Sequence, residues 1–159
     1  MIDAEAFFDL AREHFKWLVA DFRFHEDSHE SLIRESRLIL SVIRWVSNRR
    51  FVEAVLEAPR PYLDIAFGPL VHGAPPAADD IFNRFHLSQL AAVLGDREVA
   101  ARLGDIGGLN RRKIDRGLHE GSLYLRRHAD DVLRGGDAKF DEIRAYAHWV
   151  IEQNRNALM

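Results

Sequence analysis

Three short runs of strand-forming residues in the interval 38–68 limit the folds open to this chain more than any other feature. The first run, Leu38 to Val46, is rich in β-branched and aromatic residues, which suit a pleated and partly buried surface. Residues 47–50 (SNRR) are polar and include an asparagine that tolerates positive φ, so they predict a tight turn into the second run, Phe51 to Leu56. Together these runs predict a β-hairpin.

Two prolines then fix the end of the second strand. Pro59 and Pro61 lack the N–H that a central strand needs for pairing, so they force a connection before the third run, Tyr62 to Phe67. This run alternates in the manner of a strand with one buried face. The residues expected on the buried face are Leu63, Ile65 and Phe67. The result is an antiparallel meander of three to four strands, whose second face is not cleanly polar and should be covered by a helix or a partner.

Helical periodicity brackets the meander. After Asp3, which can cap a helix, apolar residues recur every three or four positions through residues 8–22. A second pattern predicts a helix from Arg111 to Leu133, in which Gly121 indicates close approach to another backbone. A last helix is predicted from Asp137 to about Gln153, antiparallel to the one before it. The proline- and glycine-rich residues 68–80 predict an irregular crossing between sheet and helices.

The length of 159 residues, of which 47% are hydrophobic, suits one well-filled core and is short for two. We therefore expect a single α+β domain over residues 1–159, with an N-terminal helix, the meander, and C-terminal helices packed on the sheet. The absence of cysteine excludes disulfides and thiolate chemistry. With no long apolar run and no signal-like N-terminus, we expect a cytoplasmic protein without a membrane partner.

The net charge of −3 argues against general nucleic-acid binding, but it hides an asymmetry. Residues 1–35 carry nine acids and four bases, a net charge of −5, whereas residues 110–127 carry six bases and two acids, a net charge of +4. Such a separation of charge is compatible with a protein partner of complementary charge.

Residues 25–31 (HEDSHES) are too polar for a core, and we expect an exposed connection there. His25, Glu26 and His29 spell H-E-x-x-H, the motif in which two imidazoles on one face of a helix bind zinc and the glutamate acts as a general base. The intervening residues favour a turn instead of a helix, and no downstream segment supplies an obvious third ligand. We therefore expect no metal site here, with a zinc-dependent activity kept as an alternative.

The segment Gly107 to Arg112 places glycines and bases just before a predicted helix. The N-terminus of a helix offers free N–H groups and the positive end of its dipole, so an anion could bind there. The spacing of a phosphate-binding or dinucleotide-binding loop is absent, and no cofactor is implied. The simpler interpretation is a helix-breaking linker with a solvated basic face.

The order of segments along the chain resembles a group of small, uncharacterised bacterial α+β proteins. The resemblance rests on LVADFRF at the end of the first helix, VIRWVSNRRFVEAVLEAPRPYLDIAFGPL in the meander, and DDVLRGGDAKFDEI near the C-terminus. It covers most of the chain and implies a shared fold, but it implies no activity. Arg23 departs from the pattern, in which a glycine usually precedes the phenylalanine, so the resemblance does not define the turn after the first helix.

No set of residues in the sequence forms a catalytic constellation, so we expect a non-enzymatic module that binds another protein. An immunity-like or antitoxin-like factor and a homodimer are the two forms considered. Exposed aromatic residues with nearby arginines are typical binding anchors, and the candidate partner-binding residues are Trp45, Tyr62, Arg111 and Arg112. The alternative is an enzyme or a small-molecule or metal-binding domain that uses His25 and His29 or the segment Gly107 to Arg112.

Overall fold

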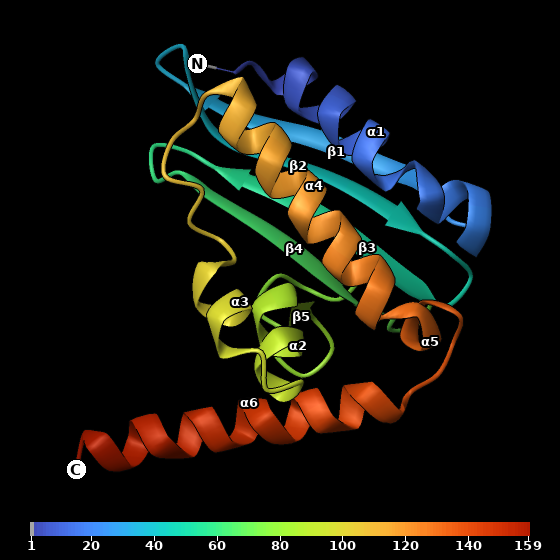
Figure 1. The fold of residues 1–159 in the computed structure, drawn as a ribbon, viewed down its shortest axis with the longest axis vertical. Coiled ribbons are helices and arrows are strands. Elements are labelled where there is room, and N and C mark those ends of the chain that lie inside the picture. The colour runs from blue at the N-terminus through green and yellow to red at the C-terminus, as the bar shows by residue number, and fades with distance from the viewer. Residues whose placement is uncertain (1) are drawn as a thin grey trace.

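The computed structural model describes residues 2–159 and shows an α+β protein built around one antiparallel sheet (Figure 1). The elements are α1 (Ala4–Phe22), β1 (His25–Arg34), β2 (Arg37–Val46), β3 (Arg50–Glu57), β4 (Tyr62–Pro69), β5 (Phe85–His86), α2 (Leu87–Val93), α3 (Arg97–Arg102), α4 (Arg111–His128), α5 (Asp130–Leu133) and α6 (Ala138–Ala157). The strands lie in the order β1-β2-β3-β4-β5. Helices α1 and α4 lie side by side across one face of the sheet, and α2, α3 and α6 lie on the β4–β5 side. The predicted α+β class is confirmed.

Helix α1 begins where its cap predicts. Oδ1 of Asp3 accepts a hydrogen bond from the backbone N–H of Ala6 at 2.7 Å. The helix ends at Phe22 because Arg23 adopts the left-handed region, with φ 61°, and donates its N–H to the carbonyl of Leu18. Glycine would adopt this conformation without steric cost, so Arg23 keeps a turn that its side chain disfavours.

The three predicted strands are confirmed as β2, β3 and β4, which pair in a continuous antiparallel register. Ala54 in β3 lies opposite Ile43 in β2 and Ile65 in β4. These residues face α1 and α4, because side chains directly opposite each other in a sheet share a face. The sheet residues of this main core are Ile43, Trp45, Val52, Ala54, Leu56, Leu63, Ile65, Phe67 and Phe85.

Strand β1 corrects the prediction that residues 25–31 form an exposed connection. The run from His25 to Arg34 pairs with β2 except at Asp27, so the sheet has five strands instead of three or four. All ten residues of β1 are exposed, which explains why the run lacks an apolar pattern. An edge strand needs only one neighbour, and charged side chains on it discourage pairing with further chains. A β-bulge between Glu26 and Ser28 interrupts the register.

The turn between β1 and β2 contains two residues in the left-handed region, although neither is glycine. Arg34 and Arg37 pair across the turn, and the residues between them, Glu35 and Ser36, have φ values of 49° and 61°. Positive φ at both central residues is the geometry of a two-residue turn that matches the twist of its strands. The turn therefore fits the hairpin at some cost in backbone strain.

The helix predicted from Arg111 to Leu133 is divided in two. Helix α4 ends at His128, and Ala129 leaves the helical region, with φ −114° and ψ 14°, before the short α5. Within α4, Gly121 makes the close approach that the sequence indicated, because a Cβ at this position would overlap Cδ1 of Ile65. The glycine thus allows α4 to lie directly on β4.

Helix α6 packs mainly against α2 and α5, instead of forming the predicted antiparallel pair with α4 (Figure 1). It also holds the segment that precedes β5. Nε of Arg144 donates to the carbonyl of Phe82 at 2.8 Å, and the rings of Phe82 and His148 stack with centroids 4.7 Å apart. The helix continues to Ala157, beyond its predicted end.

Arg50 connects the start of β3 to the junction between α5 and α6. Its buried guanidinium donates to the carbonyl of Val132 at 2.8 Å, to the carbonyl of Gly136 at 3.2 Å, and to Oδ1 of Asp137 at 2.7 Å. A buried cation needs such acceptors to offset its lost hydration. The junction is therefore fixed against the sheet by one side chain.

Candidate functional site

The four residues predicted to bind a partner do not share one surface. Trp45 lies on the core face of β2, where it is 2% exposed and stacks on Phe15 with ring centroids 5.1 Å apart. Tyr62 begins β4 on the opposite face and is partly exposed. Arg111 and Arg112 are exposed in the first turn of α4. Of these residues, Tyr62 borders both surfaces that could receive a partner or a ligand.

The segment Gly107 to Arg112 uses several of its polar groups within the chain. Nζ of Lys113 donates to the carbonyl of Gly107 at 2.7 Å, and Oδ1 of Asp105 accepts the N–H of Gly107 at 2.8 Å. Oδ1 of Asn110 accepts the N–H of Lys113 at 3.0 Å and caps α4. The segment therefore forms the capped start of α4.

The two histidines of the H-E-x-x-H sequence lie on opposite faces of β1. His25 pairs with Val46, on the face away from α1 and α4. His29 instead packs on Phe8 of α1, with ring centroids 4.9 Å apart. The bulge in β1 does not bring the two imidazoles together, so they cannot ligate one ion as they would on a helix.

Glu26, the central residue of the same sequence, forms an ion pair with α1. Nε of Arg12 donates to Oε1 of Glu26 at 2.7 Å. This hydrogen bond lowers the pKa of the Glu26 carboxyl and raises the pKa of the Arg12 guanidinium. Over residues 2–159 no group of three or more His, Asp or Glu side chains is placed to hold a metal ion.

The face of the sheet opposite α1 and α4 is open in part. Leu32 on β1 is 43% exposed, and its neighbours Leu40 and Val42 on β2 are only half-buried. Exposed apolar side chains that adjoin one another are typical of interaction surfaces. We call this region the open sheet face; it comprises Glu30, Leu32, Leu40, Val42, Val55, Glu57, Tyr62 and Asp64.

Acidic and apolar residues alternate across the open sheet face. In the strand register, Glu30 lies opposite Val42, Glu57 opposite Leu40, and Asp64 opposite Val55. Asp64 accepts a hydrogen bond from Nδ1 of His86 at 2.7 Å. Within the described chain no ion pair engages Glu30 or Glu57. The open sheet face thus offers an apolar centre beside two carboxylates without a partner.

The other part of this face is closed by the segment 70–84. Leu70 packs on a small second core, formed by Val46, Phe51 and Ala66. Gly68 lies so close to the carbonyl of Asn83 that a Cβ would overlap it. The closing segment thus lies directly on the end of β4.

Glu53 lies in β3 between the closed and the open parts. Its carboxylate is 1% exposed, with Oε1 2.5 Å from Nε of Arg44 and Oε2 2.5 Å from Nη2 of Arg84. The Arg84 guanidinium also lies over the ring of Phe51, 5.8 Å from its centroid. Two cations around one buried carboxylate attach the closing segment to the middle of the sheet.

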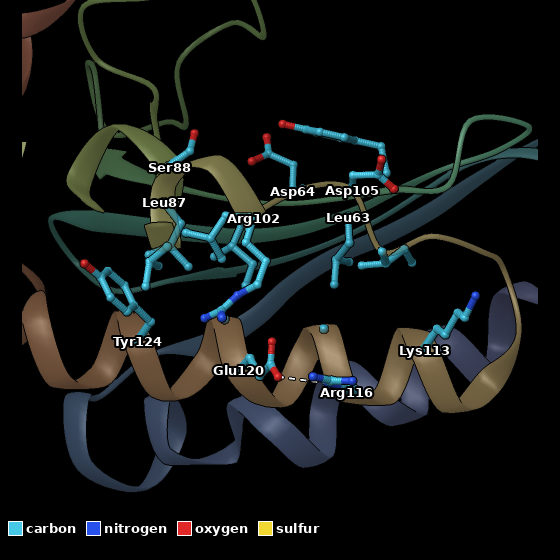
Figure 2. A pocket seen from close by; sticks show the side chains of 18 residues that line it. Leu63, Asp64, Leu87, Ser88, Arg102, Asp105, Lys113, Arg116, Glu120 and Tyr124 are labelled. Carbon is cyan, nitrogen blue, oxygen red and sulfur yellow. Dashed lines mark hydrogen bonds and ion pairs between the residues drawn. The ribbon is translucent and has the colours of Figure 1, made fainter. Parts of the chain in front are cut away.

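A cavity of about 280 Å³ lies between α4, β4 and the segment that contains α2 and α3 (Figure 2). Its apolar wall consists of Leu63, Ile65, Leu87, Val99, Leu103 and Ile106. The backbone of this segment is tied to β4, because the N–H of Leu63 donates to the carbonyl of Gly104 at 2.8 Å. The wall is therefore held by main-chain bonds as well as by packing.

Charged side chains from α3 and α4 border the cavity. Figure 2 shows Arg102 extending from α3 toward α4, where Glu120 and Arg116 are joined by an ion pair of 3.0 Å. No carboxylate oxygen of residues 2–159 lies within 4.0 Å of a side-chain nitrogen of Arg102. The guanidinium is thus free to meet an anion.

Tyr62 and Ser88 add hydroxyl groups to the same lining. Burial raises the pKa of the Tyr62 phenol, and the charges of Asp64 and Glu57 raise it further. The hydroxyl of Tyr62 therefore keeps its proton at neutral pH and can donate a hydrogen bond.

Comparisons with protein-family models, curated proteins and solved structures found no match to this chain. None of the helices in the described part of the chain has the length and hydropathy needed to cross a bilayer.

Sequence reasoning did not identify Arg102 as a site residue, and it did not place Leu40 and Val42 on an open face where they are only half-buried. Arg102 is one of many arginines, and only the fold shows that it lacks a carboxylate partner. An available signal was Gly117, which lies one helical turn before Gly121 and on the same face of α4. Two glycines on one face of a helix indicate that the helix lies close to a neighbouring element. A cavity can form beside such a contact, where larger side chains are missing.

Proposed function

We propose that the chain is a protein-binding module that uses the open sheet face to hold a partner with an apolar surface flanked by basic residues. The observation that carries the proposal is the alternation of acidic and apolar residues across β1 to β4. Apolar contact supplies association energy, and carboxylates at the border select a partner of opposite charge. The proposal involves no catalytic step.

The arrangement of charges favours a different protein over a second copy of this chain. If two open sheet faces met, Glu30 and Glu57 of one copy would approach the carboxylates of the other, which is unfavourable. Pairing through the free edge of β1 is also opposed, because its bulge and its acidic residues Glu26 and Asp27 disrupt a continuous ladder. The net charge of −5 over residues 1–35 would further attract a basic partner.

An inhibitor of the immunity or antitoxin kind is the more specific form of the proposal. Such a protein covers a functional surface of its target and needs no chemistry of its own. Homodimer formation through the same face is the alternative form, which the measured mass of the complex would distinguish.

The experiment combines affinity capture from the source cells with point variants of the open sheet face. A partner that co-purifies in stoichiometric amount is identified, and its dissociation constant is measured by calorimetry. Val42→Lys and Glu57→Lys should each weaken binding at least tenfold, because they introduce charge where apolar contact or a carboxylate is required. Val19→Lys is the matched control, since Val19 is 53% exposed on α1 and lies away from this face.

The outcomes separate the alternatives. A partner bound equally by wild type and by both open-face variants would overturn the proposed surface. A dimer of the pure chain in light scattering that Val42→Lys dissociates would replace the heterologous partner with a second copy. Binding to a basic partner should also weaken as salt is raised, because screening acts on exposed charges.

A further inference from the structure

We propose that the cavity between α4 and β4 is a binding site for a small amphipathic carboxylate, with Arg102 as the residue that receives the acid group. The inference concerns a different surface from the open sheet face and does not depend on the proposed function. It rests on the shape of the cavity, on its apolar wall, and on an arginine at its border that lacks a carboxylate partner.

The cavity sets the size of the ligand. Its volume of about 280 Å³ falls just below the roughly 300 Å³ at which pockets for drug-sized ligands begin. This space would hold about nine water molecules at their volume in the liquid. An acid with roughly six to eight carbon atoms is therefore the appropriate size.

The wall sets the chemistry of the ligand's body. Leu63 and Ile65 from β4, together with Leu103 and Ile106, present hydrocarbon to the interior. A ligand gains free energy in such a site by removing apolar surface from water, and a polar sugar or a naked phosphate would not. The body of the ligand is thus aliphatic or a single aromatic ring.

The pairing of charges sets the sign of the ligand's head group. Each carboxylate that borders the cavity already has a partner within the protein: Asp64 pairs with His86, Glu120 with Arg116, and Asp105 with the N–H of Gly107. Arg102 is different, because no carboxylate within the described residues lies in ion-pair range of it. A planar guanidinium matches a carboxylate with two parallel hydrogen bonds.

The position of Arg102 supports the same sign. Figure 2 shows its guanidinium beside α4, whereas the hydroxyl of Ser88 points away from α4. Arg102 is therefore the donor that meets the head group, and it favours a group that accepts hydrogen bonds. A carboxylate meets this requirement, and an ammonium group does not.

The test uses hexanoate as the probe and hexanamide, which has the same shape without the charge, as its control. Binding to the full-length ¹⁵N-labelled protein is followed by NMR. Hexanoate should shift the amide signals of residues 103–106 and 117–121. The expected dissociation constant is about 1 mM. Hexanamide should bind about tenfold more weakly, because it lacks the charge-assisted hydrogen bonds.

Arg102→Gln should reduce hexanoate affinity about tenfold, to the level of hexanamide. Arg97→Gln provides a matched control, because Arg97 is an exposed arginine on the same helix that does not line the cavity. Its affinity should stay within about twofold of wild type. Both substitutions are at exposed positions, so the variants are expected to fold, which their spectra verify.

Val99→Phe fills the cavity and should remove binding of both probes. Equal affinities for hexanoate and hexanamide would overturn the role of Arg102, as would an equal loss in Arg97→Gln. Shifts confined to residues outside the cavity, or no shifts at ten times the expected dissociation constant, would overturn the site itself. None of these results depends on whether a protein binds the open sheet face.

Discussion

The carboxylate of Glu53 and the guanidinium of Arg84 lie 2.5 Å apart in the interior, where Glu53 is 1% and Arg84 10% exposed at the side chain. The pair joins the middle of the sheet to the segment that closes part of one face. A buried carboxylate with two arginines divides this face into a closed part and the open sheet face.

Replacing Glu53 by Gln should lower the free energy of unfolding by about 3 kcal/mol, because Arg84 would remain buried without its counter-charge. The measurement is urea denaturation followed by circular dichroism. Glu142→Gln removes an exposed ion pair with Lys139 and should change stability by no more than about 0.5 kcal/mol. Equal effects of the two substitutions would show that the Glu53 pair does not support the closing segment.

Gly121→Ala should destabilise the protein by about 1 to 3 kcal/mol, because the added methyl group would overlap Ile65. This is opposite to the gain of about 1 kcal/mol that alanine gives at an unobstructed helical position. Gly117→Ala is the graded comparison: its Cβ would lie 2.9 Å from Ile106 and Leu63, so a smaller loss is expected. A stabilised Gly121→Ala variant, measured by thermal denaturation, would contradict the close contact of α4 with β4.

Ser36→Gly should stabilise the β1–β2 hairpin by about 1 kcal/mol, because glycine removes the cost of the left-handed conformation at φ 61°. The midpoint of chemical denaturation measures this gain. The same substitution at Ser31, inside β1, should instead lower stability by about 0.5 to 1 kcal/mol. Loss of stability in both variants would mean that the turn does not have positive φ at Ser36.

Glu26→Gln should make stability less dependent on pH in the acid range. The pKa of Glu26 is lowered by its hydrogen bond to Arg12, so the stabilisation is present above the carboxyl's unfolded pKa and is lost as pH falls through the folded value. The variant should be less stable than wild type at neutral pH, by less than about 1 kcal/mol, and should approach wild type in acid. Denaturation curves over a pH series measure the difference.

A double substitution checks the source of this effect. When Arg12 is replaced by Gln, the further change Glu26→Gln should have a much smaller effect, because only the longer contact between Glu26 and His29, at 3.4 Å, remains. An unchanged pH-dependent difference in the Arg12→Gln background would assign the effect to another neighbour of Glu26.

The meander could be predicted because the residues that begin and end its strands act locally. Pro59 and Pro61 exclude ladder pairing at their own positions, and the alternation through Leu63, Ile65 and Phe67 needs no knowledge of the rest of the chain. The cap at Asp3 and the close contact of Gly121 likewise each depend on the type of a single residue. Each of these features is confirmed by the structure.

The features that the sequence did not predict depend on tertiary neighbours. Strand β1 is polar throughout, so its conformation is determined by pairing with β2 and not by its own composition. The break after His128 contains neither glycine nor proline, and therefore has no local signal. The cavity is lined by residues of β4, α2, α3 and α4, which are far apart in the sequence. Only the folded structure shows that these residues meet and that Arg102 has no carboxylate partner among the described residues.

Arg50 has a consequence for the order in which the protein can mature during synthesis. The meander is complete once residue 69 has been made, but the guanidinium of Arg50 at the start of β3 has one acceptor nearby, the carbonyl of Arg49, and finds its other acceptors at Val132, Gly136 and Asp137. A nascent chain that has not reached these residues must keep Arg50 hydrated, so the start of β3 stays exposed to water on the ribosome. Synthesis of nearly the whole chain is therefore required before Arg50 is buried, and we expect chains truncated before Val132 to be cleaved more readily by proteases.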